Sequence, residues 1–175
     1  HEYGQGVITL AGDINSMNIG ANAFEYCTTL ETITIPDNII SIGSKAFYSC
    51  TGLTSIKLPE SVNSIGDYAF GYCSSLTSIN IPSGVSTIDL GTFQNCTALE
   101  SITIPNNVTT IKAGAFASCS ALTSVTLPNS VSAIGNKAFQ GCTSLTSINI
   151  PDAVTKIEAS TFASCSALTS ITIPA

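Results

Sequence analysis

Several residue types are scarce or missing from this 175-residue sequence. It has no arginine, no tryptophan and a single histidine, His1, and charged residues make up only 9% of it. Five lysines stand against 11 acidic residues, which gives a formal net charge of −6 and a pI near 4.4. Nucleic-acid affinity comes largely from clustered lysine and arginine. We therefore predict no nucleic-acid partner, and a polar surface made mainly of serine, threonine and asparagine.

Long apolar runs are also missing. No stretch approaches the roughly 18 apolar residues needed to cross a bilayer, so no membrane span is predicted. The first residues, HEYGQG, lack the basic and apolar regions of a secretory signal. Because the chain starts at His1 without an initiator methionine, we expect a mature form or an excised piece. A hydrophobic content of 44% is sufficient for a folded domain.

A period of 23 residues dominates the sequence. Every proline lies in one column of this repeat, at Pro36, Pro59, Pro82, Pro105, Pro128, Pro151 and Pro174. Phenylalanine forms a second column, at Phe24, Phe47, Phe70, Phe93, Phe116, Phe139 and Phe162. Cysteine forms a third, at Cys27, Cys50, Cys73, Cys96, Cys119, Cys142 and Cys165, and a leucine follows three residues after each cysteine. Such a fixed period predicts a repeat architecture.

One unit, residues 53–75, reads LTSIKLPESVNSIGDYAFGYCSS. Ile56 and Leu58 alternate with Ser55 and Lys57, as in a half-buried strand that Pro59 ends. The VxxI step is interpreted as an extended turn, and the AFxxC segment as a short helix or 3₁₀ turn on the opposite side. Each unit is then one coil of a solenoid, and because a single coil cannot bury its apolar side chains, stability belongs to the stack.

The two ends differ from the middle. We predict an N-terminal strand or cap over residues 1–12, with VITL at 7–10 as the strand, and a solenoid of about seven 23-residue units over 13–175. The first unit is irregular, because Asp13 and Ser16 stand in the proline and valine columns. The chain stops at IPA, directly after a predicted strand and without a capping unit, so we expect it to be a truncated piece of a longer protein.

These columns resemble the BspA-like leucine-rich repeat family, whose unit is similar to LxxIxIPxxVxxIGxxAFxxCxx. The resemblance covers residues 13–174. It departs from the pattern at Asp89, Lys112 and Glu158, where glycine is usual, and at Thr92 and Thr161, where alanine is usual. The resemblance implies an α/β leucine-rich-repeat solenoid, with one parallel β-sheet face and short helical or 3₁₀ turns opposite. It also implies a bacterial surface or secreted protein, some relatives acting as adhesins for host matrix or plasma proteins.

The cysteine column suggests a metal site or disulfides. Stacking places successive cysteines about 5 Å apart, but their side chains should run parallel into the core, where free cysteine is common. There is no CxxC motif, and His1 is the only histidine. We predict reduced structural thiols, no metal and no cofactor.

Catalysis has little support in the sequence. No internal histidine is available as a base, and the acidic residues are scattered rather than paired by the repeat. We therefore predict that the protein is not an enzyme and has no catalytic residues.

The outward positions of the strands form a hydroxyl-rich, nearly uncharged face. The candidate partner-binding residues there are Ser55, Lys57, Ser78, Asn80, Ser101, Thr103, Ser124, Thr126, Ser147 and Asn149. Three interpretations stay open: polar residues that only solvate a sheet, a protein-binding face, or a ladder that binds ice or carbohydrate.

Four tyrosines lie beside the AFxxC segments of the first three units: Tyr26, Tyr48, Tyr68 and Tyr72. Tyrosine commonly anchors partners, so these residues are candidate partner-binding residues on the side opposite the sheet. Drift of the repeat, with partly covered rings, is the alternative.

The favoured hypothesis is a non-catalytic, extracellular or cell-surface module that binds a protein, with host matrix or plasma proteins as candidate ligands. The alternatives are a structural spacer or stalk of a larger surface protein, and the hydroxyl-ladder binder of ice or carbohydrate. The sequence does not define an oligomeric state.

Overall fold

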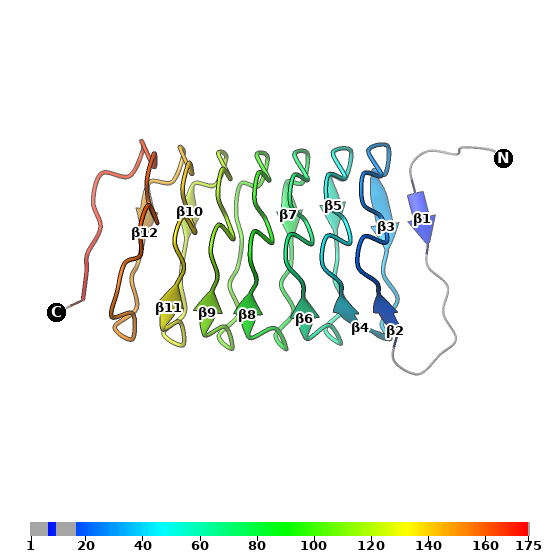
Figure 1. Ribbon diagram of the computed structural model, residues 1–175, viewed down its shortest axis with the longest axis horizontal. Coiled ribbons are helices and arrows are strands. Elements are labelled where there is room, and N and C mark those ends of the chain that lie inside the picture. Colours follow the sequence, from blue (N-terminus) through cyan, green and yellow to red (C-terminus); the bar gives the residue numbers. More distant parts are fainter. Residues whose placement is uncertain (1–6, 10–16, 175) are drawn as a thin grey trace.

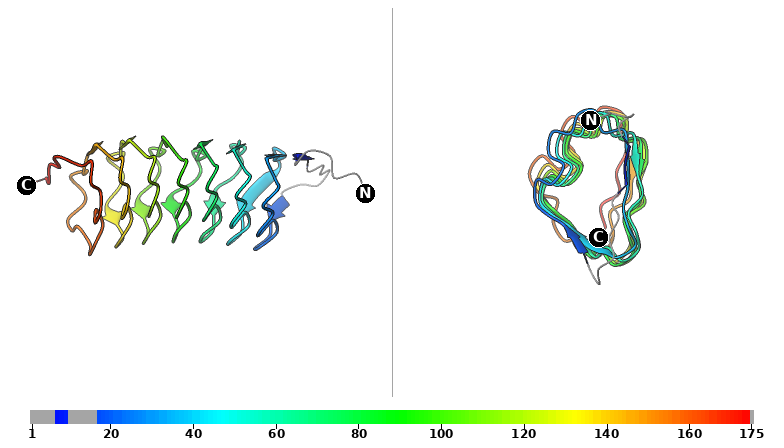
Figure 2. Two further views of the ribbon diagram at one scale, coloured as in Figure 1. Left: turned by 90° about the horizontal axis from the view of Figure 1, so that it is seen from above. Right: turned by 90° about the vertical axis from the view of Figure 1, so that its right-hand side faces the viewer.

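The computed structural model describes residues 7–9 and 17–174, which form one stack of similar coils (Figure 1). Seen along the stacking axis, the coils superpose into a closed outline (Figure 2). Equivalent residues therefore lie directly above one another, as the 23-residue period predicts. Among these residues, the structure contains no helix long and apolar enough to cross a membrane.

One strand row follows the LTSIKL segments and confirms the predicted parallel sheet. Its strands are β1 (Val7–Thr9), β3 (Thr32–Thr34), β5 (Ser55–Ile56), β7 (Ser78–Ile79), β10 (Ser124–Val125) and β12 (Ser147–Ile148). The pairs β1–β3, β5–β7 and β10–β12 are parallel. Isolated bridges join Thr34 to Lys57 and Ser101 to Ser124. From β5 onward the pairing links residues one repeat apart, such as Ser55 with Ser78.

A second strand row follows the VxxI segments, where the sequence predicted only an extended turn. It comprises β2 (Met17–Ile19), β4 (Ile39–Ile42), β6 (Ser64–Ile65), β8 (Thr87–Ile88), β9 (Thr110–Ile111) and β11 (Ala133–Ile134). These strands form two parallel sheets, β2-β4-β6 and β8-β9-β11. Proline makes the bend between the two rows, since its carbonyl accepts a hydrogen bond from the residue three positions on, as from Val62 N to Pro59 O at 3.1 Å.

The predicted helical or 3₁₀ face is wrong, because the AFxxC segments are stacked turns. In the coil that contains Phe47, amides alternate between two kinds of partner. Ala46 and Tyr48 donate within the coil, to residues 43 and 45, whereas Phe47 donates to Ala69 O in the next coil at 2.8 Å. A helix needs every amide for its own carbonyls.

Two residues of each turn also have left-handed backbone angles, such as Lys45 (φ 54°) and Ser49 (φ 58°), and this interrupts any helical run. The sequence pattern signals a compact segment, but it does not reveal that half of its amides bond to the neighbouring coil.

The phenylalanine and cysteine columns form the core, as predicted. Neighbouring rings from Phe24 to Phe162 stack nearly parallel, with centroids 5.1–5.8 Å apart and interplanar angles of 2–14°. The five central rings are 0% exposed. Isoleucine, leucine and valine from both strand rows complete one continuous cluster along the stack. Each coil therefore depends on its neighbours to bury its side chains.

The departures from the family pattern are structurally coupled. Where Asp89 and Glu158 replace glycine, the alanine three residues later becomes threonine, and its buried hydroxyl donates back to the acidic residue's carbonyl at 2.9 Å (Thr92) and 2.8 Å (Thr161). The Asp89 carboxylate also pairs with Lys112 at 2.5 Å. The turns keep their form at these sites.

The position after each strand of the second row is glycine in most coils, as at Gly43, Gly66 and Gly135. The pairing of this row is interrupted at one of the coils where another residue replaces that glycine. A Cβ on Gly66 would lie only 2.6 Å from Ser44 N, so glycine at this position permits a close backbone contact between coils. Between β6 and β8, where Asp89 fills this column, no strand pairing occurs among the described residues. Lys112 is tolerated, because β8 and β9 still pair.

At the N-terminal end of the stack, β1 pairs with β3 in parallel. The predicted boundary between a cap at 1–12 and the solenoid at 13–175 falls within residues 10–16, which lie outside the described residues, as do Asp13 and Ser16.

Candidate functional site

The thiol column is a structural feature rather than a reactive one. Six of the seven cysteines are buried, and each of these six thiols donates to the carbonyl of the phenylalanine 26 residues earlier, at 3.0–3.2 Å. Burial raises the pKa of Cys50 and of Cys142 to about 12. The thiols therefore stay protonated at neutral pH and act as hydrogen-bond donors between coils, whereas nucleophilic cysteine chemistry requires the thiolate.

No metal-ligand cluster was found in the part of the chain that the structure describes, since no three histidine, cysteine, aspartate or glutamate side chains come together there in a suitable arrangement. The candidate functional residues lie on two surfaces of the described coils.

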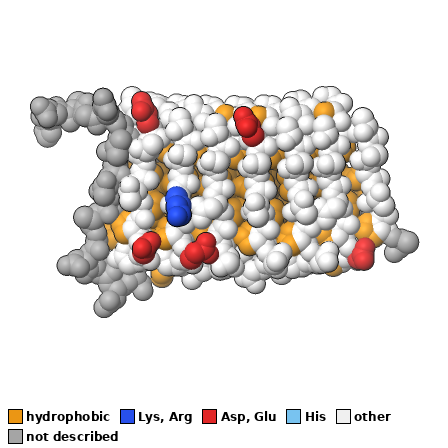
Figure 3. Space-filling model, turned by 180° about the vertical axis from the view of Figure 1, so that it is seen from behind, with side chains coloured by type: hydrophobic (Ala, Val, Ile, Leu, Met, Phe, Trp, Pro, Cys, Tyr) orange, Lys and Arg blue, Asp and Glu red, His pale blue; other side chains and the backbone are white. Residues whose placement is uncertain are grey.

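The first surface is the outward side of the first strand row. We call it the hydroxyl face and define it by Ser55, Lys57, Ser78, Asn80, Ser101, Thr103, Ser124, Thr126, Ser147 and Asn149. All of these residues are exposed except Asn80, which is half-buried. From this side the molecule shows mostly uncharged polar side chains, with hydrophobic side chains visible between the coils (Figure 3).

Hydroxyl groups elsewhere on the coils are used to bind neighbouring coils. Thr77 donates to Thr54 O at 3.1 Å, and Thr146 donates to Thr123 O at 3.1 Å. A further column, from Thr97 to Ser166, donates to the preceding coil at 3.3–3.4 Å. The serines of the hydroxyl face differ: within the described residues, the hydroxyls of Ser55, Ser78, Ser101, Ser124 and Ser147 make no intramolecular hydrogen bond. They are free to bind water or a ligand.

Two predicted partner-binding residues are instead engaged in holding coils together. The Asn80 side chain accepts from Leu58 N and donates to Leu58 O, both at 2.8 Å. Asn149 makes the same two bonds with Leu127, again at 2.8 Å. These amides clamp one coil to the previous one, next to prolines that cannot donate to a ladder. Their polar groups are consequently less available to a partner than the sequence suggested.

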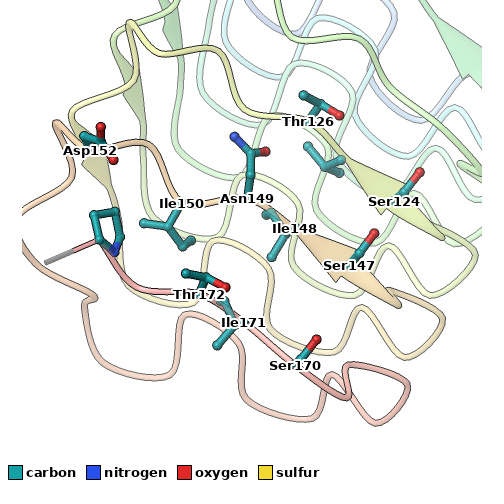
Figure 4. Close-up of a pocket in the computed structure, with 12 residues that line it drawn as sticks. Ser124, Thr126, Ser147, Ile148, Asn149, Ile150, Asp152, Ser170, Ile171 and Thr172 are labelled. Carbon is teal, nitrogen blue, oxygen red and sulfur yellow. The ribbon is translucent and has the colours of Figure 1, made fainter.

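Shallow depressions run along the hydroxyl face. One is lined by Ser55, Lys57, Glu60, Ser78 and Asn80, and another by residues of the last coils, including Ser124, Ser147, Asn149 and Asp152. In the second, Ser124, Ser147 and Ser170 lie in one row across successive coils, with isoleucine side chains beside them (Figure 4). The face thus alternates polar rows with strips of apolar surface.

Charge is distributed unevenly around the described coils. The hydroxyl face has Lys57 as its one cation and is bordered by five exposed carboxylates: Glu31 and Glu100 before the strands, and Asp37, Glu60 and Asp152 after the prolines. Figure 3 shows acidic side chains along both borders. The other described charges are four carboxylates and four lysines, which balance. Hydrogen bonds from Ser83, first from its backbone amide, lower the pKa of Glu60 and keep that carboxylate ionised.

The second surface is the tyrosine cluster, formed by Tyr26, Tyr48, Tyr68 and Tyr72. The stack brings all four predicted tyrosines together around Tyr48. The rings of Tyr26 and Tyr68 stand nearly perpendicular to it, at 86° and 81°, and Tyr72 is tilted by 56°, with centroid distances of 5.3–6.4 Å. Tyr26 is 64% exposed and Tyr72 is 40% exposed. Partial burial raises the pKa of Tyr48.

Residues that sequence reasoning missed support this cluster. Lys45 Nζ lies 5.4 Å from the centroid of the Tyr48 ring, which is a cation–π contact. The Tyr68 ring lies over Gly91, where an added Cβ would come within 2.2 Å of the ring. Gly91 has φ +57° and occupies the same turn column as Lys45 and Tyr68. The signal was present as a glycine in that column, but only the stacking shows which ring it accommodates.

Comparison with known proteins assigns the family. The model of the BspA type leucine rich repeat region matches residues 17–143 and 91–175. The chain therefore belongs to the BspA-type leucine-rich repeat family, which confirms the resemblance predicted from the repeat columns. Leucine-rich repeat proteins generally serve as protein-interaction or surface modules, and the fold is typically a non-enzymatic scaffold. No curated protein matches the chain.

Solved structures of bacterial proteins share the fold. A leucine-rich repeat protein of T. pallidum is 31% identical, with a TM-score of 0.81, over 93% of this chain and 76% of that one. One from Bacteroides ovatus is 28% identical, with a TM-score of 0.72, over 94% of this chain and 51% of that one.

A leucine rich cell surface protein of Faecalibacterium prausnitzii is 31% identical, with a TM-score of 0.60, over 82% of this chain and 47% of that one. The chain thus spans about half the length of the Bacteroides and Faecalibacterium proteins.

Proposed function

We propose that this chain is a non-catalytic, cell-surface or secreted module that binds a protein ligand through the hydroxyl face. The observation that carries the proposal is the contrast among hydroxyl groups. Threonines beside the face bond to the preceding coil, whereas the serine row at its centre is exposed and has no intramolecular partner in the described coils. The face offers donors and acceptors on a rigid support, so little ordering entropy is lost on binding.

The surface location is supported by a relative. The Faecalibacterium protein, 31% identical to this chain, is described as a leucine rich cell surface protein. An adhesin-like role at the cell surface, with a host matrix or plasma protein as ligand, fits a repeat module with a regular face whose central coils expose uncharged polar side chains.

The experiment is capture of partners from a panel of extracellular-matrix and plasma proteins by the immobilised chain. The test variant carries Ser101→Arg and Ser124→Arg at the centre of the hydroxyl face. The control carries Ser86→Arg and Ser132→Arg, two exposed serines next to the second strand row. Both variants gain the same charge, and the control also loses the weak bond from the Ser132 hydroxyl to Thr109 O at 3.5 Å, so capture that the control retains does not reflect a milder substitution. We expect the test variant to lose the captured proteins and the control to retain them.

Two results would reject the proposal. Equal capture by both variants would place binding elsewhere, with the tyrosine cluster as the next candidate. No capture by the unmodified chain would favour a spacer or stalk of a larger surface protein.

The ice- or carbohydrate-binding alternative has a separate check. Lys57 and the Asn80 and Asn149 clamps interrupt the hydroxyl rows. We therefore expect no thermal hysteresis, and a clear freezing-point gap would revive that alternative.

A further inference from the structure

The net negative charge of the described coils lies entirely on the hydroxyl face. Five carboxylates border that face against the single cation Lys57, while the charges on the remaining surface cancel. Within the described coils, no carboxylate of the face forms an ion pair, whereas Asp89 and Glu158 on the other surface are paired with Lys112 and Lys156. The negative potential is therefore concentrated on one side, where among the described residues only Lys57 reduces it.

The arrangement of these carboxylates fits an extended polypeptide ligand better than a small molecule or a single ion. They stand in two borders separated by the strand segment of a coil: Glu31 and Asp37, for example, are six residues apart, or roughly 20 Å along an extended chain. Along the stacking axis they extend from the coil of Glu31 to that of Asp152. The strip between the borders holds the exposed serine row, and the isoleucines beside it are more than nine-tenths buried, so positive side chains would reach the borders while a backbone occupied the centre.

We infer that the hydroxyl face binds a basic polypeptide segment, a stretch of a partner protein with several lysine or arginine side chains. This inference rests on the proposed function at the same face and adds the chemistry of the partner. The serine hydroxyls donate and accept hydrogen bonds to the backbone of the segment. The border carboxylates attract its cationic side chains and steer its approach.

Other partner classes fit the face less well. Acidic proteins, nucleic acids and anionic lipid surfaces are repelled by the border carboxylates. A carbohydrate usually requires an aromatic ring on which a sugar can stack, and the residues that line the depressions of this face include none. The tyrosine cluster belongs to the turns and is not part of the hydroxyl face.

Replacing Lys57 gives a variant that is expected to bind a basic segment more tightly. It lies between the two borders near the N-terminal end of the face, where it weakens the negative potential around Glu60, and the repeat places threonine at the equivalent positions 103 and 126. A change of Lys57→Thr therefore removes the one repulsive charge and keeps the residue type of the column. A variant that binds better is difficult to attribute to misfolding.

The experiment measures the fluorescence anisotropy of a labelled peptide of alternating lysine and serine as the chain is added. The titration is done in buffers with about 20 mM and about 200 mM salt, because screening of charge interactions increases strongly between these two salt concentrations. A peptide of alternating glutamate and serine is the negative control. The face variant is Glu31→Gln, Glu60→Gln and Glu100→Gln. Its matched control, Glu25→Gln, Asp89→Asn and Glu158→Gln, removes the same number of charges from the other surface.

We expect the face variant to weaken binding of the lysine peptide about tenfold, the control variant less than about threefold, and Lys57→Thr to tighten it about two- to fivefold, from the effect of exposed charge pairs. Higher salt should reduce all of these differences. Equal weakening by both triple variants, or unchanged affinity for Lys57→Thr, would overturn the inference.

The two proposals fail in different ways. If the panel yields partners whose capture is insensitive to the face carboxylates, the basic-segment inference fails and protein binding at the face stands. If the serine-to-arginine variant captures as well as its control does, the face itself is excluded.

Discussion

The hydroxyl face and the tyrosine cluster occupy one solenoid but arise differently. The face repeats once per coil, because outward strand positions recur every 23 residues, and five equivalent serines share one environment. The cluster does not repeat: it needs tyrosines from three different turn columns and a glycine at position 91 to accommodate one ring. Periodic features are explained by the scaffold itself, so a feature that breaks the period requires a local explanation.

The largest expected effect comes from a change on which both surfaces depend. Phe93 is fully buried and stacks between Phe70 and Phe116 at 5.8 and 5.4 Å. Phe93→Ala should lower the free energy of unfolding by about 3–5 kcal/mol, because it leaves a cavity in the ring column. Urea denaturation followed by circular dichroism would measure it. A loss below about 1 kcal/mol would show that the stack does not depend on this column.

High pH should loosen the same core through the thiols. Burial raises the pKa of Cys142 from 9.0 to about 12. A raised pKa means that the stabilising contribution is complete below pH 9 and is lost as the pH rises toward 12. At pH 10 the loss is about 1 kcal/mol for a deeply buried thiol. Thermal melts between pH 7 and pH 11, compared with those of Cys142→Ala, should show a shallower decline for the variant, and parallel curves would contradict the assignment.

A middle-sized effect separates two kinds of residue within the hydroxyl face. Asn80→Ala removes both clamp bonds to Leu58 and should cost about 1–3 kcal/mol of stability. Ser78→Ala, two residues away, removes an exposed hydroxyl without an intramolecular partner and should cost about 0.5 kcal/mol or less. Denaturant titration would measure both losses in unfolding free energy. If Asn80→Ala and Ser78→Ala lost the same amount, the Asn80 bonds to Leu58 would not stabilise the stack.

The smallest stability effect is expected at the tyrosine cluster. Tyr26→Ser combined with Tyr72→Ser exchanges two exposed rings and should cost about 1 kcal/mol or less. If a partner docks on this cluster, its affinity should fall although the fold is intact, and capture assays with the double variant would show the fall. Unchanged affinity for every captured protein would indicate that the tyrosines reflect drift of the repeat.

The parts of the fold that the sequence predicted correctly are those marked by recurring apolar residues, which must be buried. The columns of Phe93 and Cys96 were assigned to the core because an apolar residue type that recurs in every coil must be shielded from water, and both are fully buried. The helical turns were wrong, since a sequence shows that Phe47 is buried but not that its amide bonds to Ala69. The charged border was missed because Glu31 and Asp152 are far apart in sequence and share a face only after stacking.

The sequence by itself determined the repeat length, the family, the strand that ends at each proline and the columns of buried rings and thiols, because apolar side chains recurring at a fixed interval have one way to escape water. Tertiary structure alone decided which polar groups bond between coils, how the tyrosines meet and where the net charge gathers. Those outcomes depend on contacts between residues about 23 positions apart, and such contacts exist only once the coils are stacked.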